Sequence, residues 1–218
     1  MRSLILAAGR FDDALKKRIA EDREPRLDVF ELADALGATV LDFGDVDRSS
    51  SSAVKLTARA AGASAAVALL GFQQRARFDA IFTTGEDIGL PLAALLKTSR
   101  ARCSHTMIAH TLYPAKKRVF FSVGRVHSQL DRVLVYSTSE ERLAIDELHV
   151  PAERVERLYY HADQKFFRPS DAPSEPGLVC AAGQLLRDYD CLIAAVRNLP
   201  IRVQIAAGSP WIDSKLEP

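Results

Sequence analysis

The residues of this chain with the strongest chemical potential stand directly after short apolar runs. His110 ends one such run, where a histidine can donate a hydrogen bond or carry charge beside reacting groups. A structural histidine bonded to the backbone is the alternative. Glu86 and Asp87 follow another run, and they can hold an acceptor's hydroxyl groups or cap the next helix. Gly9 and Arg10 follow the first run.

A second group of candidates lies near the C-terminal end. Gly183 and Gln184 follow the apolar run Leu178–Ala182, and Asp188 begins a helical pattern. A glycine in this place lets backbone N–H groups approach an anion, and the start of the helix adds a favourable partial charge. Arg187 can supply the mobile positive charge that a diphosphate requires. One glycine after a strand is common, so the spacing alone indicates phosphate binding only weakly.

Alternating strand and helix patterns position these residues. Strands are expected at Leu4–Ala8, Ala38–Phe43, Asp79–Thr84, Thr106–His110, Arg132–Ser137 and Arg154–Tyr160. Helices are expected at Arg26–Leu36, Ala53–Phe72, around Pro91–Lys97, at Lys116–Leu130 and at Ser139–Leu148, with a mobile loop at Gly44–Ser52. Apolar strands separated by helices predict an α/β fold with a parallel, Rossmann-like sheet covered on both faces. Such sheets bind ligands at the carboxyl ends of their strands.

The chain organisation predicts two α/β domains of unequal completeness. Residues 1–165 form the first, and residues 166–176 belong to a proline-bearing linker without an apolar period. The β/α alternation restarts at residues 177–218, which supply two strands and one helix and therefore only the beginning of a second Rossmann-like domain. Two strands leave apolar area and open edges, so self-association through this incomplete sheet is expected.

Composition excludes several classes of protein. The net charge is +1, which gives no case for nucleic-acid binding. Three distant cysteines and the lack of metal-ligand spacing predict no metal site. No targeting or membrane-spanning run stands out, which favours the cytoplasm. The segment Lys97–Arg125 has no acidic residue. It can therefore contact anionic lipid at the inner membrane surface, or form a solvated helix with one face in the core.

The stretch after residue 135 resembles glycosyltransferase family 4. Val135–Ser139 and the segment VPAERVERLYYHADQKFFRP are similar to the end of that family's N-terminal domain, although His161-Ala162 stands where Gly-Val is usual. The start of the family's donor domain is matched by Gly183, Leu185, Tyr189, Asp190, Leu192, Ile193 and Ala195. Gln184 replaces a common arginine, and Arg187 lies nearest the usual lysine.

The resemblance implies a GT-B glycosyltransferase, in which two Rossmann-like domains enclose the active site. It implies a retaining, metal-independent transfer, without a cofactor, from a nucleotide-diphosphate sugar to a sugar or lipid-linked acceptor. The implied roles are catalysis for His110, acceptor binding for Gly9, Arg10, Glu86 and Asp87, and donor-phosphate binding for Gly183, Gln184 and Arg187.

The family's acidic Glu-x7-Glu helix would lie after Pro218. The chain alone is therefore expected to bind donors weakly and to transfer nothing. Two rival functions stay open. One is a noncatalytic α/β module that binds a ligand or partner; the other, a dinucleotide enzyme, is disfavoured because Gly-x-Gly-x-x-Gly is absent.

Overall fold

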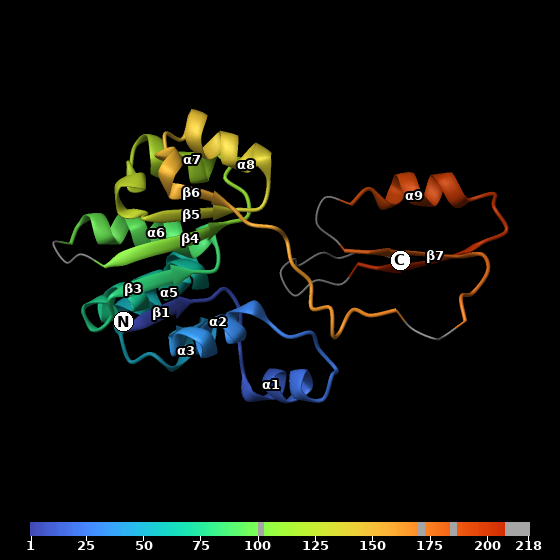
Figure 1. The fold of residues 1–218 in the computed structure, drawn as a ribbon, viewed down its shortest axis with the longest axis horizontal. Coiled ribbons are helices and arrows are strands. Elements are labelled where there is room, and N and C mark those ends of the chain that lie inside the picture. The colour runs from blue at the N-terminus through green and yellow to red at the C-terminus, as the bar shows by residue number, and fades with distance from the viewer. Residues whose placement is uncertain (100–102, 170–172, 184–186, 208–218) are drawn as a thin grey trace. The chain divides into compact units, whose positions relative to one another are not determined.

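The computed structural model describes residues 1–99, 103–169, 173–183 and 187–207. The chain forms two compact units, Met1–Arg168 and Pro169–Pro218 (Figure 1). Each unit has a sheet of its own. Assignment of the first unit to an acceptor and the second to a donor stays a prediction.

A six-stranded parallel sheet forms the centre of the first unit. Its strands are β1 (Ser3–Leu6), β2 (Thr39–Leu41), β3 (Ala80–Thr83), β4 (Ser104–Ala109), β5 (Arg132–Val135) and β6 (Val155–Arg157). Their order in the sheet is β2-β1-β3-β4-β5-β6, and every neighbouring pair is parallel. The predicted α/β fold is therefore confirmed, and all six predicted strands of this unit are present.

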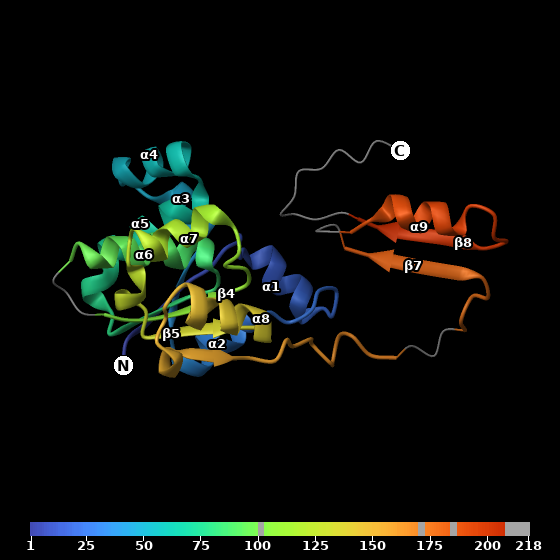
Figure 2. The same ribbon diagram turned by 90° about the horizontal axis from the view of Figure 1, so that it is seen from above.

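Helices cover both faces of this sheet. The helices of this unit are α1 (Asp13–Ala20), α2 (Asp28–Leu36), α3 (Phe43–Arg48), α4 (Ser52–Ala61), α5 (Ala63–Gln74), α6 (Glu86–Lys97), α7 (Ala115–Ser122) and α8 (Thr138–Arg142). On one face, Leu4 and Ile81 belong to a buried cluster with residues of α5 and α6. On the opposite face, Ile5 packs with Val29 of α2. In Figure 2 the helices α3 to α7 gather on one side of the strands, and α2 lies on the other.

Two expected helices are wrong in their bounds. The single helix expected at Ala53–Phe72 is two helices, because Gly62 between them has a φ of 87° and cannot continue an α-helix. The helix expected at Lys116–Leu130 ends at Ser122, before Gly124. A separate 3-10 turn, Val126–Gln129, follows it. Gly37, in contrast, ends α2 in the left-handed conformation, directly after Leu36, where the helix expected at Arg26–Leu36 also ends.

The loop expected at Gly44–Ser52 is also wrong, because most of it is the helix α3. Asp42 and Asp45 form a capping box, in which each carboxylate accepts a hydrogen bond from the other residue's backbone N–H. This reciprocal bonding satisfies two donors that a helix start otherwise leaves without partners. The segment Arg10–Pro25, which carries no clear pattern, contains α1, and none of the residues of that helix is buried.

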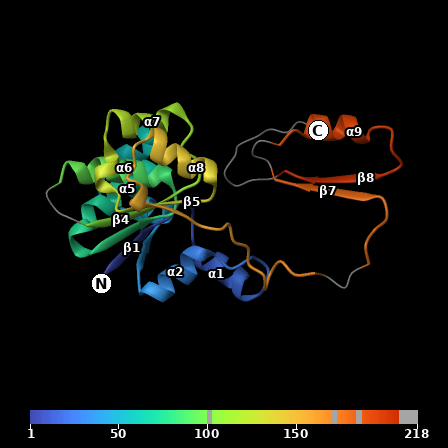
Figure 3. The same cartoon turned by 45° about the horizontal axis from the view of Figure 1, so that its top comes forward.

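The second unit is one β-α-β arrangement in its described part. β7 (Leu178–Ala182) and β8 (Arg202–Ala206) pair in parallel, and α9 (Tyr189–Val196) connects them. None of its residues within 173–183 and 187–207 is buried. In Figure 3 this unit is the orange and red part of the ribbon. Among the described residues of the chain, no helix has the length and hydropathy to cross a membrane.

Candidate active site

His110 stands one residue past the end of β4, with its ring exposed to solvent. The ring Nε2 lies 3.0 Å from the carbonyl oxygen of Thr84. A carbonyl oxygen can only accept, so Nε2 carries the proton in this contact, and in the neutral ring Nδ1 then keeps its lone pair. A neutral imidazole in this tautomer can accept a proton or a hydrogen bond from a hydroxyl group. The structure thus places a potential base at the carboxyl edge of the sheet.

Glu86 holds the backbone on which His110 stands. It lies in the first turn of α6 and is only 3% exposed. Its carboxylate accepts hydrogen bonds from the backbone N–H groups of His110, at 2.8 Å, and of Thr111, at 3.3 Å. Lys117 of α7 adds an ion pair at 2.5 Å. Because these donors occupy both oxygens, Glu86 contributes to this site by fixing the loop after β4.

A second buried carboxylate fixes the next residue of the same loop. Glu140 of α8 accepts a hydrogen bond from the backbone N–H of Leu112 at 3.0 Å. Burial raises the pKa of Glu140, and the hydrogen bond from Leu112 opposes that rise. Three consecutive N–H groups, those of residues 110–112, are therefore held by two carboxylates from two different helices. We call Glu86, Glu140 and Lys117 the buried clamp.

Sequence patterns missed two members of the buried clamp. The serines and glutamates at the start of this helix predict a cap at Ser137 or Ser139, and the Ser137 hydroxyl does accept a hydrogen bond from the Glu140 N–H at 3.1 Å. The Glu140 side chain turns to Leu112 instead. Lys117 looked like part of a basic surface. It is 7% exposed and also pairs with Asp87 at 3.2 Å. Burial alone would lower the pKa of Lys117, but hydrogen bonds and charge from Glu86 and Asp87 outweigh it and raise that pKa.

A cavity of about 360 Å³ opens beside the buried clamp. Its wall includes Glu86, Asp87, Lys116 and the residues around Gly62 at the junction of α4 and α5. Unlike Glu86, Asp87 has a largely exposed side chain, with 61% of it accessible. Asp87 can therefore contact a ligand directly in this cavity, while Glu86 acts through the loop.

Thr84 connects the end of β1 with His110 at the carboxyl edge of the sheet. The Thr84 hydroxyl accepts a hydrogen bond from the backbone N–H of Ala8 at 3.2 Å, and the Thr84 carbonyl contacts the ring of His110. Gly9 is buried, and its carbonyl accepts from the N–H of Phe43 at 3.0 Å. Arg10 is exposed and forms an ion pair with Asp47. The structure thus links the ends of β1, β3 and β4 through one threonine.

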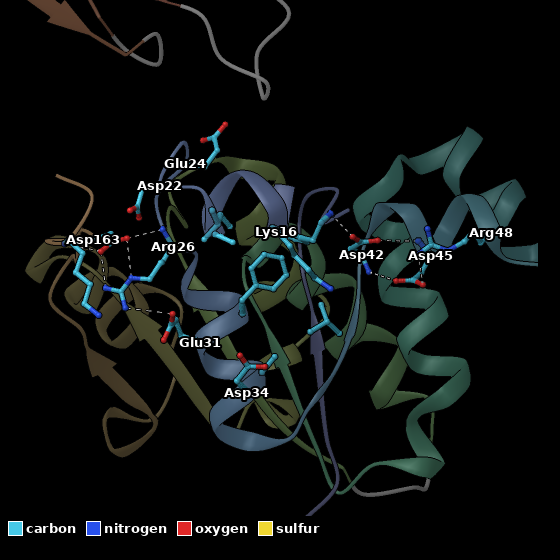
Figure 4. A pocket seen from close by; sticks show the side chains of 17 residues that line it. Lys16, Asp22, Glu24, Arg26, Glu31, Asp34, Asp42, Asp45, Arg48 and Asp163 are labelled. Atoms are coloured by element: carbon cyan, nitrogen blue, oxygen red, sulfur yellow. Dashed lines mark hydrogen bonds and ion pairs between the residues drawn. The ribbon is translucent and has the colours of Figure 1, made fainter. Parts of the chain in front are cut away.

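A larger cavity, of about 700 Å³, lies beside α1 and α2 (Figure 4). Phe11, Phe30 and Val40 give it apolar wall, and charged side chains surround them. Arg26 and Asp163 close one end, with the Asp163 carboxylate accepting from the backbone N–H, Nε and Nη2 of Arg26 at 2.8, 3.1 and 2.8 Å. These hydrogen bonds hold the pKa of Asp163 well below its usual range. Neither His110 nor Gly9 lines either of these two cavities.

The predicted phosphate-binding residues lie in the second unit. Gly183 follows β7 with a φ of 103°, and its N–H donates to the carbonyl of Ala206 at 3.0 Å. Arg187 lies beside it, since a Cβ on Gly183 would stand 3.3 Å from the Arg187 Nε. Asp188 caps α9 by accepting from the N–H of Cys191 at 2.8 Å. Gln184 lies outside the described residues.

The comparison with protein families decides the classification. A model described as the glycosyl transferase 4-like domain matches residues 9–161, which is most of the chain. The chain belongs to the glycosyltransferase 4-like family. The resemblance to the family is thereby confirmed for its N-terminal domain, while the expected start of a donor domain lies after the matched residues and stays a prediction. A search of curated proteins found no match.

The matched span of this glycosyltransferase 4-like chain contains the whole buried clamp and His110. It also contains Gly9, Arg10, Glu86 and Asp87. The family identity supports a transferase with a sugar donor and an acceptor as substrates. Within the described residues, no three His, Cys, Asp or Glu side chains are close enough together to hold a metal ion.

Proposed function

We propose that this protein transfers a sugar from a nucleotide-diphosphate sugar to an acceptor, with His110 at the reaction centre. The observation that carries the proposal is the buried clamp. It fixes three successive N–H groups after β4, while Thr84 orients the ring of His110 so that Nδ1 keeps its lone pair. A group held this rigidly at the carboxyl edge of a parallel sheet is well suited to act on a bound substrate.

The acceptor side of the proposed reaction lies in the first unit. Arg10 and Asp87 are exposed enough to contact the acceptor directly. Gly9 has no side chain, so an acceptor can approach the backbone closely at the end of β1. Glu86 serves the acceptor site indirectly, because Lys117 and two backbone N–H groups already occupy its carboxylate. His110 then accepts or shares the proton of the reacting hydroxyl, or stabilises charge that develops beside it.

The donor side of the proposed reaction lies in the second unit. Gly183, Gln184 and Arg187 would hold the donor diphosphate, with Arg187 as the cation. The departing diphosphate gains negative charge in the transition state, so positive charge near it lowers the barrier. A retaining stereochemical course without a metal ion is part of this proposal, on the strength of the family membership.

A donor screen tests the proposed function. The complete encoded protein is incubated with UDP-, GDP-, ADP- and TDP-sugars and a mixture of simple glycoside acceptors, and released nucleoside diphosphate is measured. We expect release from at least one donor, dependent on acceptor. Binding of nucleotide sugars without release in any combination would contradict the proposal.

One observation favours a second candidate function. The cavity of about 700 Å³ has the volume of a small-molecule site and is not lined by His110. A noncatalytic module that binds a ligand there is therefore the alternative. Micromolar ligand binding that survives Phe30→Ala would argue against that alternative, because Phe30 forms part of the cavity wall.

We also propose a cytoplasmic protein that touches anionic membrane through Lys97–Arg125. Val119 and Val123 of this segment expose 54% and 78% of their surface, with Lys116 and Arg125 exposed nearby in sequence. Lys117 and Arg118 contribute less, since the first is buried with Glu86 and the second pairs with Glu147. Self-association through the sheet of the second unit is a further proposal, supported by its lack of buried residues in the described part.

A further inference from the structure

Four aromatic rings form a continuous row at the carboxyl ends of β4, β5 and β6. His110 stacks on Tyr136, with ring centroids 5.5 Å apart and planes at 27°. Tyr136 meets Tyr160 edge to face, at 5.0 Å and 60°. Tyr160 stacks on His161 at 6.2 Å and 24°. We call these four residues the aromatic row. Its members come from three segments of the chain that the sheet brings together.

Core packing does not account for the aromatic row. Tyr160 leaves 80% of its surface exposed, His110 and His161 are exposed, and Tyr136 is half-buried. Ring pairs of this geometry stabilise a fold modestly, but burial, the main source of aromatic stabilisation, is small at Tyr160. A cluster of solvent-exposed aromatic side chains indicates a binding surface more often than a purely structural role.

Polar groups surround the aromatic row. At the end of β5, the hydroxyls of Ser137 and Ser139 lie 2.9 Å apart. The Asp28 carboxylate of α2 lies 3.5 Å from the Nε2 of His161. Burial raises the pKa of Tyr136, with the charge of Asp28 adding to that rise, so the phenol stays a neutral donor. The surface therefore combines flat apolar faces with hydroxyl and carboxylate groups at their edges.

We propose that the aromatic row is the stacking platform for the sugar ring of the acceptor. This inference rests on the proposed glycosyl transfer and narrows its acceptor to a saccharide. A pyranose has one face of C–H groups, which the negative π face of an aromatic ring attracts, and hydroxyls around its rim. A lipid chain would leave the polar rim unused. Since the row begins at His110, a ring stacked on it lies next to the proposed base.

Saturation-transfer NMR on the whole chain tests the platform without requiring turnover. Protein aromatic protons are irradiated in the presence of methyl glycosides of glucose, galactose and mannose, with sorbitol and uridine as comparison ligands. We expect transfer to the C–H groups of at least one glycoside and little to sorbitol, which has no ring face. Transfer to uridine alone would show a nucleobase site and overturn the proposal, as would the absence of any glycoside signal.

Variants assign the signal to the row. Tyr160→Leu keeps an apolar side chain but removes the ring, and it should reduce the glycoside signal at least fivefold. Tyr160→Phe should retain it. Tyr159→Leu is the matched control, because Tyr159 is its neighbour, is 89% exposed and, among the described residues, forms no ring pair with a member of the row. Equal loss in Tyr160→Leu and Tyr159→Leu would overturn the assignment.

The two proposals fail separately. A glycoside signal that depends on Tyr160, in a protein that releases no nucleoside diphosphate from any donor, would keep the platform and remove the transferase. Acceptor-dependent release with the same acceptor KM in Tyr160→Leu and Tyr159→Leu would keep the transferase and remove the platform.

Discussion

The buried clamp and the large cavity lie in the same unit, yet they use charge in opposite ways. In the clamp, Glu86 and Lys117 are 3% and 7% exposed and meet at 2.5 Å. At the cavity wall, Arg48 pairs with Asp45 at 3.0 Å, and the arginine side chain is 72% exposed whereas that of Asp45 is 28% exposed. The first arrangement fixes a loop in one position. The second leaves the cation of the pair in solvent, where it can turn toward a ligand.

The physical cost of these arrangements differs as well. Removing one partner of a buried ion pair leaves an uncompensated charge in a medium of low polarity, which costs about 3–5 kcal/mol. Exposed pairs contribute about 0–1 kcal/mol, and salt screens them. If rigid presentation of His110 depends on the clamp, changes there should alter stability and function strongly, whereas changes at the cavity rim should alter stability little.

The largest expected effect follows from Lys117→Met. This change leaves the carboxylate of Glu86 buried with two backbone donors and no cation, and should reduce the free energy of unfolding by about 3–5 kcal/mol. Urea denaturation followed by circular dichroism measures it. Lys116→Met, at the exposed neighbouring position, should change it by less than about 0.5 kcal/mol. Equal effects of the two variants would show that Lys117 and Glu86 do not form a buried ion pair.

The next effect is a dependence of stability on pH, caused by the buried residue His105. His105 is fully buried beside Thr83, with Nε2 3.1 Å from the threonine hydroxyl, and burial lowers its pKa to about 4. The unfolded chain takes up this proton near pH 6.5 and the folded chain only near pH 4. Stability should therefore fall as the pH falls through this window, by about 3 kcal/mol in total.

Unfolding free energies measured between pH 7 and pH 4 test this dependence. In His105→Asn the curve should be flatter over the same window, although the variant starts from a lower stability. Parallel curves for the two proteins would mean that His105 is not the group responsible.

A smaller effect is expected at the cavity. Arg26→Ala removes two side-chain hydrogen bonds from Asp163 but leaves the backbone N–H that also binds this carboxylate. The loss of stability should be clearly less than for Lys117→Met. The difference between Arg26→Ala and the unaltered protein should shrink in 1 M NaCl, where the Debye length is about 3 Å. A loss as large as that of Lys117→Met would erase the contrast between the two regions.

The smallest effect concerns membrane contact. Lys116→Gln and Arg125→Gln should each weaken binding to anionic vesicles by about 1 kcal/mol, or roughly fivefold. Arg118→Gln should weaken it less, because Arg118 pairs with Glu147 at 2.6 Å. Sedimentation with vesicles of phosphatidylserine and phosphatidylcholine measures this. Equal sedimentation with pure phosphatidylcholine would exclude the electrostatic contact.

The fold and part of the candidate site could be predicted from the sequence, but the buried charges could not. Apolar strands and the Gly37 stop depend on local patterns, and the structure confirms them. The carboxyl-edge rule also placed Glu86 and His110 at neighbouring strand ends, and they are joined by a hydrogen bond. Lys117 and Glu140 could not be predicted in this way, because their partners lie on other elements, and only the packed fold shows which charges are buried.

The large cavity escaped prediction for a different reason. Its wall depends on α1, a short helix with no buried residue, in which four of the eight residues are charged and obscure the helical spacing of Leu15 and Ile19. The capping box of α3 was visible as Asp42-x-x-Asp45, but the serine run after it indicated a loop. Ring contacts such as Tyr136 with Tyr160 join residues 24 positions apart, so no local period indicates them.

The central claim is that transfer depends on His110 as the buried clamp presents it. Its most direct test is the rate of acceptor-dependent release of nucleoside diphosphate by His110→Ala, compared with Asp34→Asn in the wall of the large cavity and with His149→Asn at an exposed histidine. We predict that kcat/KM falls at least about tenfold in His110→Ala and stays unchanged in the other two. An unchanged rate in His110→Ala, with a fall in Asp34→Asn, would contradict the account and move the active site to the cavity.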